Sequence, residues 1–221
     1  MHLVRRVHSH LKERCAEGLI LMSRVMGVLG VSIVAFVAVC AVVIQAQDDE
    51  YDGPNYVDET NLILPDDYRE WIFLSAGFNM TYLEETQGNQ APPDLFQNVF
   101  VNRSSYRYFM ETGTWPDQTI FVLELRRAIS DASINATGRT QSELFFLEAE
   151  VKDSRFPDGW AFFNFGPAGS IRDTVAPLEG DQVAPCVKCH TEHTAAERTF
   201  VQFYPTLYEV AKSKGTLKPG F

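Results

Sequence analysis

At residues 186–190 the chain reads Cys-Val-Lys-Cys-His, so two thiols lie three residues apart and an imidazole follows at once. This pattern is the attachment signature of a c-type haem, whose vinyl groups bond to the sulfurs and whose iron takes the histidine as an axial ligand. On one helical turn both sulfurs project toward the same porphyrin edge, and the chain then carries the imidazole under the iron. We therefore predict one covalently attached haem c, held by Cys186 and Cys189, with His190 as the proximal iron ligand.

Three other interpretations use the same residues. A zinc site would combine Cys186, Cys189, His190 and His193, but zinc modules separate their two ligand pairs by a loop of roughly a dozen residues. A thioredoxin-like redox pair needs its cysteines after a strand in a βαβ pattern, which this region lacks. A structural disulfide across such a short loop would be strained. The spacing favours haem over all three.

The N-terminus contains one long apolar stretch. Residues 25–44 are almost continuously apolar, follow Arg24 and precede a polar, acidic segment. This order predicts export, and we assign residues 1–46 to an N-terminal extension with a signal peptide or a signal anchor. The stretch is also long enough to span a bilayer, so both a cleaved and an uncleaved form stay open. The sequence thus predicts a periplasmic protein that would meet a membrane only through this segment, and only if the segment is not cleaved.

The chain is acidic, with a formal net charge of −10, and after residue 46 its 27 acidic residues outnumber 14 basic ones. Such a surface repels nucleic acid and would attract a positively charged redox partner protein. Cys15 and Cys40 precede residue 47, so the 186–190 motif contains all later cysteines. We divide the remainder into a flexible acidic lead-in at 47–61 and one haem domain at 62–221.

Local patterns predict an α+β fold, mainly an antiparallel β-sheet with a few short helices and a C-terminal haem-attachment helix. Strand signals, rich in β-branched and aromatic residues, lie at 98–101, 119–125, 144–151 and 160–165. Short connections between the last three favour antiparallel pairing. Helical signals lie at 64–70 as a first turn, at 106–111 between a cap at Ser104 or Ser105 and a stop at Gly113, at the haem motif and at 206–212. Loops are expected at 84–94, 130–140 and 166–181.

Few residues can close the sixth coordination position of the predicted haem. After residue 46 the only histidines are His190 and His193, and the only methionines are Met80 and Met110. His193 follows the axial histidine by three residues, so it lies on the same side of the haem and cannot reach the opposite face. The iron is therefore open to small ligands unless Met80 or Met110 binds it, which would make the protein an electron-transfer cytochrome.

Segments along most of the exported domain resemble the cytochrome P-460 family, which includes the β-sheet cytochromes c′-beta. The likeness rests on LPDDYREW at 64–71, NVFV at 98–101, SYRYFMETGTWPDQT at 105–119, GWAFF at 159–163, CVKCH at 186–190 and TFVQFYPTL at 199–207. It implies a mostly antiparallel β domain, a c-type haem on the two cysteines and His190 as the proximal ligand. Other cytochromes c′ are four-helix bundles, and this sequence is too rich in strands for a bundle.

The resemblance also implies two alternative activities. Members with the full P-460 cofactor oxidise hydroxylamine and need a lysine that cross-links to the haem, but the corresponding segment reads Phe109-Met110-Glu111 here. This departure favours the c′-beta type, in which an uncross-linked haem with an apolar distal pocket binds nitric oxide or carbon monoxide. Hydroxylamine oxidation stays open as an enzyme activity, and no catalytic residue is assigned.

Phe73 and Phe109 are the candidates for the distal pocket, where an apolar ring excludes water and anions but admits small neutral gases. Either ring equally suits a position in the core. Arg126, Arg127 and Arg172 are candidates for pairing with the haem propionates. The expected partners are a small gaseous or nitrogen-oxide ligand and a redox partner protein, with a homodimer left open and no nucleic acid.

Overall fold

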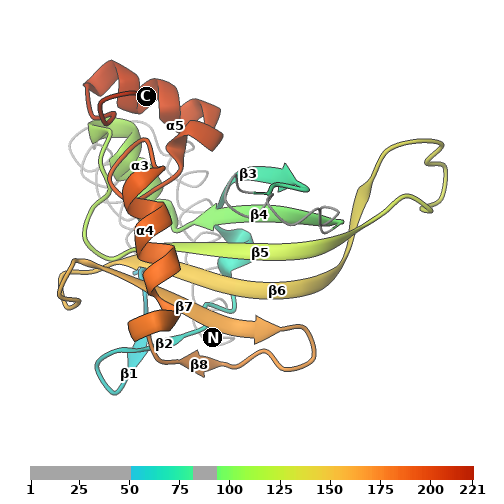
Figure 1. The fold of residues 1–221 in the computed structure, drawn as a ribbon, viewed down its shortest axis with the longest axis horizontal. Helices are drawn as coiled ribbons and strands as arrows, with labels where there is room; N and C mark the ends of the chain where they lie inside the picture. Colours follow the sequence, from blue (N-terminus) through green and yellow to red (C-terminus); the bar gives the residue numbers. More distant parts are fainter. Residues whose placement is uncertain (1–50, 82–93) are drawn as a thin grey trace, which may run out of the picture. The chain divides into compact units, whose positions relative to one another are not determined.

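A five-stranded antiparallel sheet dominates the fold (Figure 1). The computed structural model describes residues 51–81 and 94–221, and the predicted export segment lies outside them. The strands are, in spatial order, β3 (Ile72–Phe78), β4 (Leu95–Val101), β5 (Thr119–Ile129), β6 (Thr140–Lys152) and β7 (Trp160–Pro167). Each strand pairs with its neighbour in the chain, as short connections favour. The predicted α+β fold with a mainly antiparallel sheet is confirmed.

Side chains alternate between the two faces of this sheet because successive strand residues point to opposite sides. On β5, Ile120 and Val122 belong to a first core, whereas Phe121 belongs to a second core on the other face. Leu62 and Val175 are buried in the first core. They come from a small antiparallel sheet that covers it, made of β1 (Tyr56–Val57), β2 (Asn61–Ile63) and β8 (Thr174–Val175). The 3-10 turn η1 (Tyr68–Glu70) adds Tyr68 to this core.

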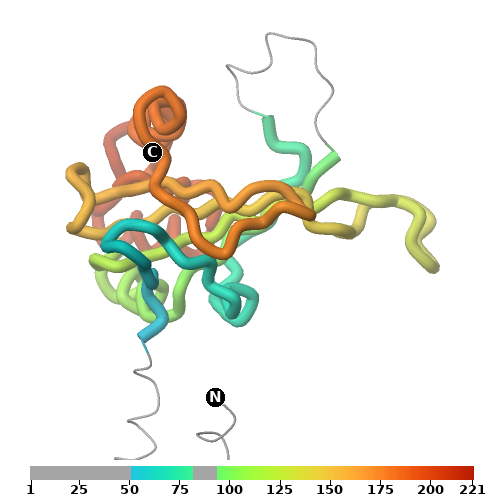
Figure 2. The backbone as a smooth tube through the Cα atoms, turned by 90° about the horizontal axis from the view of Figure 1, so that it is seen from below, coloured from blue at the N-terminus to red at the C-terminus, as the bar shows by residue number. Residues whose placement is uncertain are grey.

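Two helices pack against the opposite face of the five-stranded sheet through the second core. Helices α3 (Arg103–Thr112) and α5 (Pro205–Lys214) bury Phe109 and Leu207 there, together with Trp115 and Phe121. Helix α4 (Ala184–Glu192) contains the cysteine–histidine motif and follows the 3-10 turn η3 (Gly180–Gln182), and a further turn η4 (Val201–Phe203) lies before α5. Figure 2 shows α4 and the small sheet on opposite sides of the five strands.

Helix α3 begins earlier than its sequence indicates. Asn102 occupies the N-cap position, so the predicted cap at Ser104 or Ser105 is wrong. The Asp52 carboxylate instead accepts hydrogen bonds from the Ser104 amide at 2.9 Å and from Asn102 Nδ2 at 3.3 Å. Gly113 ends the helix with a φ of 75°, as predicted, because glycine adopts the left-handed conformation without strain. A distant carboxylate therefore supplies the cap that local sequence assigned to a serine.

The small sheet was not predicted. Strand β1 lies within the segment 47–61 that the sequence indicates to be flexible. Strand β8 lies within the loop predicted at 166–181, and η3 begins at the end of that loop. Leu62 pairs with Tyr56 on one side and with Val175 on the other, so the pairing joins distant parts of the chain. The loop predicted at 84–94 falls almost entirely outside the described residues. Within residues 51–81 and 94–221, no helix has the length and apolar character needed to cross a membrane.

Candidate functional site

Helix α4 presents the motif to the same sheet face that carries α3 and α5. Pro185 lies in its first turn, where the missing amide hydrogen costs no hydrogen bond. No side chain of α4 is fully buried, and Cys186, Cys189 and His190 are all half-buried. The helix expected over the motif is confirmed, and all three side chains of the motif are partly accessible.

A cavity of about 320 Å³ lies between α4 and the sheet. Cys186 and His190 line it from the helix. The strands contribute Ser75, Ala76, Gly77, Gln97, Val99, Phe121, Leu123, Glu148, Ala149, Glu150, Phe162 and Phe163, and the other lining residues are Met80, Leu178, Thr199, Phe200, Phe203 and Tyr204. A second hollow, of about 610 Å³, borders β6 and β7 but contains no residue of the motif. The reactive side chains therefore single out the first cavity.

The orientation of His190 is fixed by its neighbours. Its Nδ1 lies 2.8 Å from the carbonyl oxygen of Arg198, and because a carbonyl only accepts, Nδ1 carries the hydrogen. Glu150 Oε1 lies 3.1 Å from the same nitrogen but is not aligned to accept a hydrogen bond, so it acts through its charge. The rings of Phe162 and Phe200 pack edge-on against the imidazole, with centroids 4.8 and 4.7 Å away. This arrangement leaves Nε2 as the nitrogen that can bind a metal.

Two glutamates of β6 lie on the cavity side of the sheet. Glu148 and Glu150 alternate with core residues, so both face α4 rather than the first core. Burial raises the pKa of both carboxyl groups, and the charge of His190 opposes this only in part. Burial alone would lower the pKa of His190, but the Glu150 charge and the bond to the Arg198 carbonyl raise it. Burial, and then the charge of Glu148, raises the pKa of the Cys186 thiol. A raised pKa shifts a carboxyl group toward its neutral form, and in neither form does it offer an entering anion a cation to pair with, so these two side chains favour a neutral ligand.

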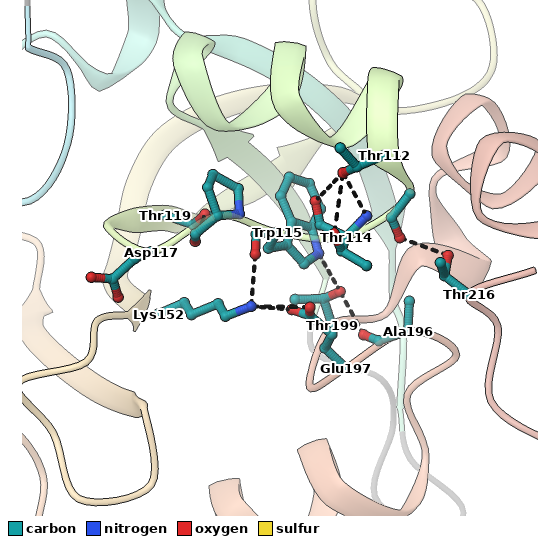
Figure 3. Close-up of polar contacts among 12 residues, drawn as sticks. Thr112, Thr114, Trp115, Asp117, Thr119, Lys152, Ala196, Glu197, Thr199 and Thr216 are labelled. Atoms are coloured by element: carbon teal, nitrogen blue, oxygen red, sulfur yellow. Dashed lines mark hydrogen bonds and ion pairs between the residues drawn. The ribbon is translucent and has the colours of Figure 1, made fainter. Parts of the chain in front are cut away.

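A polar network holds the loop that supplies the Arg198 carbonyl (Figure 3). Lys152 Nζ, at the end of β6, donates to both carboxylate oxygens of Glu197 at 3.0 Å and to the carbonyl of Trp115 at 2.7 Å. Trp115 Nε1 in turn donates to Thr199 Oγ1 at 2.8 Å. Glu197 and Thr199 flank Arg198 in the chain, so the acceptor of the imidazole hydrogen bond is anchored on both sides.

The two predicted distal phenylalanines lie apart from the cavity. Phe73 is 52% exposed and packs edge-on against Phe100, with ring centroids 5.5 Å apart. Phe109 is fully buried in the second core, 4.2 Å from the ring of Trp115. Neither is among the residues that line the cavity beside His190. The structure does not bring them together with the motif, and a distal role stays a prediction for both.

Of the other candidate iron ligands and propionate partners, most lie away from the cavity. Met80 lines the cavity, whereas Met110 packs against the second core. His193 follows the last residue of α4 with its side chain 58% exposed, outside the cavity. Three arginines were proposed for the propionates, and all bind elsewhere: Arg126 to Glu124, Arg127 to Glu143 and Arg172 to the carbonyl of Asn164.

Most of the cavity wall was missed from the sequence. Glu148 and Glu150 alternate with Leu147, Ala149 and Val151, which indicates a strand with one polar face but not what covers that face. Phenylalanines on both sides of the imidazole had no local signal, because the sequence contains 16 of them. The alternation of the glutamates is the one pattern that would have directed attention to β6.

The donors present fit a haem. The Cys186 thiol and an imidazole whose Nε2 has no protein partner among the described residues border a single cavity with largely aromatic and aliphatic walls, and Cys189 lies one helical turn from Cys186 on the same helix. The polar groups of the wall that approach the imidazole do so at Nδ1, and they leave the nitrogen needed for the iron.

The family model for cytochrome P460 matches residues 65–201, which is more than half of the chain. This chain therefore belongs to the cytochrome P460 family and is a haem-binding cytochrome. The matched range includes all five strands of the main sheet and the whole of α4. Among curated proteins, no sequence matches the chain.

Proposed function

We propose that this cytochrome is an exported c-type monohaem protein whose iron takes His190 as its fifth ligand and keeps the sixth position open for small nitrogen oxides or gases. Cys186 and Cys189 attach the porphyrin through thioether bonds. The haem, when bound, supplies an iron that binds such ligands and exchanges one electron. The residues of the chain attach it, orient the imidazole and limit the access of water and anions.

The surroundings of His190 carry this proposal. A backbone carbonyl occupies Nδ1, and two phenylalanine rings prevent free rotation of the imidazole, so Nε2 is presented in one orientation. Partners of this kind fix the tautomer of a metal-binding histidine and raise its basicity. The Glu150 carboxyl at 3.1 Å adds to that basicity through its charge. A histidine that lines a cavity beside Cys186 and has only its Nδ1 engaged is arranged as a metal ligand would be.

The cavity lining supports a small neutral ligand. Val99, Phe121 and Leu123 offer an apolar surface from the strands. Such a surface gives an anion no hydrogen bonds to replace those that it loses with water. Nitric oxide and carbon monoxide lose little on entering, because they are small and neutral.

The positions of the lysines support ligand binding over hydroxylamine oxidation. No lysine is among the described residues that line the cavity. Lys152 is bound to Glu197 and Trp115, and Lys218 donates to the carbonyl of Thr191 and the hydroxyl of Thr194. A cross-linked cofactor of the P-460 kind needs an amine beside the porphyrin. The described lysines therefore favour an unmodified haem.

A second candidate function rests on Met80. Its side chain lines the same cavity as His190, and a thioether opposite a histidine closes the iron of electron-transfer cytochromes. With Met80 bound, the protein would carry electrons and would not bind small ligands.

The optical spectrum of the holoprotein separates these functions. We expect a high-spin ferric spectrum and saturable binding of nitric oxide and carbon monoxide to the ferrous form. A low-spin spectrum that does not respond to carbon monoxide would support the electron carrier. Ferric protein mixed with hydroxylamine and an electron acceptor should not turn over repeatedly, and sustained turnover would support hydroxylamine oxidation instead.

The variant His190→Ala tests the proximal ligand. It should keep covalent haem but lose normal ligand binding, and unchanged binding would remove His190 from the proximal role.

A further inference from the structure

Gly77 on β3 is a glycine that the backbone does not require. Its φ is not positive, so any residue fits its main-chain conformation. A Cβ built at this position, however, would collide with the sulfur of Met80 and lie 2.8 Å from its Cγ. The side chain of Met80 therefore lies directly on Gly77, in space that only glycine leaves open. We call this contact the Gly77 seat.

The backbone around Met80 is built to fold back onto the seat. Asn79 has a positive φ of 53°, which asparagine tolerates better than most residues and which turns the chain after β3. The Asn79 amide donates to the carbonyl of Leu95 at 2.9 Å, and the Leu95 amide donates to Asn79 Oδ1 at 3.0 Å. Gln97, the cross-strand partner of Gly77, lies on the same face and directs Nε2 at the Met80 carbonyl at 3.5 Å. The position of the thioether is thus fixed by the turn and by the missing side chain together.

The seat lies at the opposite end of the cavity from His190. The imidazole packs on β6 and β7, whereas Gly77 and Met80 belong to β3 and the turn after it, at the other edge of the sheet. Three strand spacings separate β3 from β6, which is about 14 Å at 4.8 Å per spacing. Nδ1 of His190 is the nitrogen that contacts Glu150 of β6, and a haem held by His190 in this cavity would lie between the imidazole and the seat. A thioether is a soft donor that binds haem iron when it comes within reach.

We propose that Gly77 is a positioning residue that holds the Met80 thioether on β3 and thereby keeps the sixth coordination position open. This inference rests on the proposed function and adds a determinant of ligand access to it. Without the seat, the sulfur has to move off the strand, and the cavity is the space that Met80 already borders. One missing Cβ then decides between a ligand-binding and a methionine-closed iron.

The variant Gly77→Ala tests this directly. The clash falls on the far end of a flexible side chain, so the protein should fold while Met80 moves. If the thioether bound the iron in about nine of ten molecules, the affinity for carbon monoxide would weaken about tenfold, because the apparent Kd is the intrinsic Kd divided by the fraction of molecules with an open site. The ferric spectrum should shift toward low spin in parallel. The double variant Gly77→Ala/Met80→Leu keeps the bulk, removes the sulfur and should restore the high-spin spectrum.

Controls separate this inference from the proposed function. Met110→Leu changes a methionine of the second core and should leave carbon monoxide affinity unchanged. A crystal structure of the Gly77→Ala holoprotein should show Met80 displaced from β3, a result that does not depend on ligand binding. If Met80 is not displaced, or if the loss of affinity persists in the double variant, the positioning role of Gly77 is wrong while the proposed function stands. A wild-type protein that binds carbon monoxide only after Met80→Leu overturns both, because Met80 is then the ligand already.

Discussion

Replacing Phe109 by alanine should destabilise the protein without changing its ligand binding. The ring is 0% exposed, lies 4.2 Å from that of Trp115 and packs with Leu207 in the second core. Removing a buried phenylalanine side chain costs about 3–5 kcal/mol, since the lost burial and the remaining cavity both contribute. A domain of this size has about 5–15 kcal/mol of stability, so the variant should still fold.

Denaturant unfolding of the holoprotein, followed by far-UV circular dichroism, measures the loss for Phe109→Ala, and ferrous carbon monoxide titration measures the ligand affinity. Phe73→Ala is the matched control: its ring is 52% exposed, so the expected cost is below about 1 kcal/mol. Ligand affinity should be the same as wild type in both variants, because neither ring lines the cavity. A tenfold change in affinity for Phe109→Ala at a small cost in stability would refute this reasoning and support a role for Phe109 in the distal pocket.

Two further outcomes are expected. Replacing both Cys186 and Cys189 by alanine should make the haem extractable with acidic organic solvent, and haem that stays covalent would contradict the attachment. Burial alone would raise the pKa of Glu124, but hydrogen bonds from Arg126, Tyr68 and other neighbours lower it below the ordinary 4.5. Its contribution to the unfolding free energy is therefore complete above pH 4.5 and is lost as the pH falls further. Glu124→Gln should reduce this acid dependence and cost about 3–5 kcal/mol at neutral pH, because it breaks a buried ion pair; an unchanged acid titration of stability would contradict this.

The elements that the sequence predicts correctly have local causes. The strand over 119–125 appears because its β-branched and aromatic residues favour extended backbone, and the structure continues it as β5 to Ile129. Helix α4 appears from its motif and from Pro185 in the first turn. The small sheet has no such cause. Its strands have two or three residues, and Leu62 and Val175 are brought together by packing on the first core rather than by local sequence.

In the candidate site, too, some residues have a local sequence signal and others have none. The predicted attachment residues and the predicted axial histidine are assigned from spacing alone, since one helical turn sets their geometry. The acceptor for His190 is the backbone carbonyl of Arg198, and a carbonyl has no signature in the sequence because every residue has one. The distal candidates Phe73 and Phe109 were chosen for being aromatic and apolar. At the far end of the cavity the wall that the structure describes is instead formed by Gly77 and a methionine folded onto it.

The two ends of the cavity differ in how strongly the fold constrains them. The histidine end is tied to the second core, because Trp115 packs there and also binds Thr199, next to the carbonyl that holds the imidazole. A change at that end therefore disturbs packing as well as chemistry. The β3 end is set by the tip of one flexible side chain and by the absence of one Cβ. Substitutions there should change the shape of the cavity at little cost in folding free energy. If the proposed function holds, substitutions at Gly77 and Met80 should therefore change ligand preference without disturbing the predicted attachment residues.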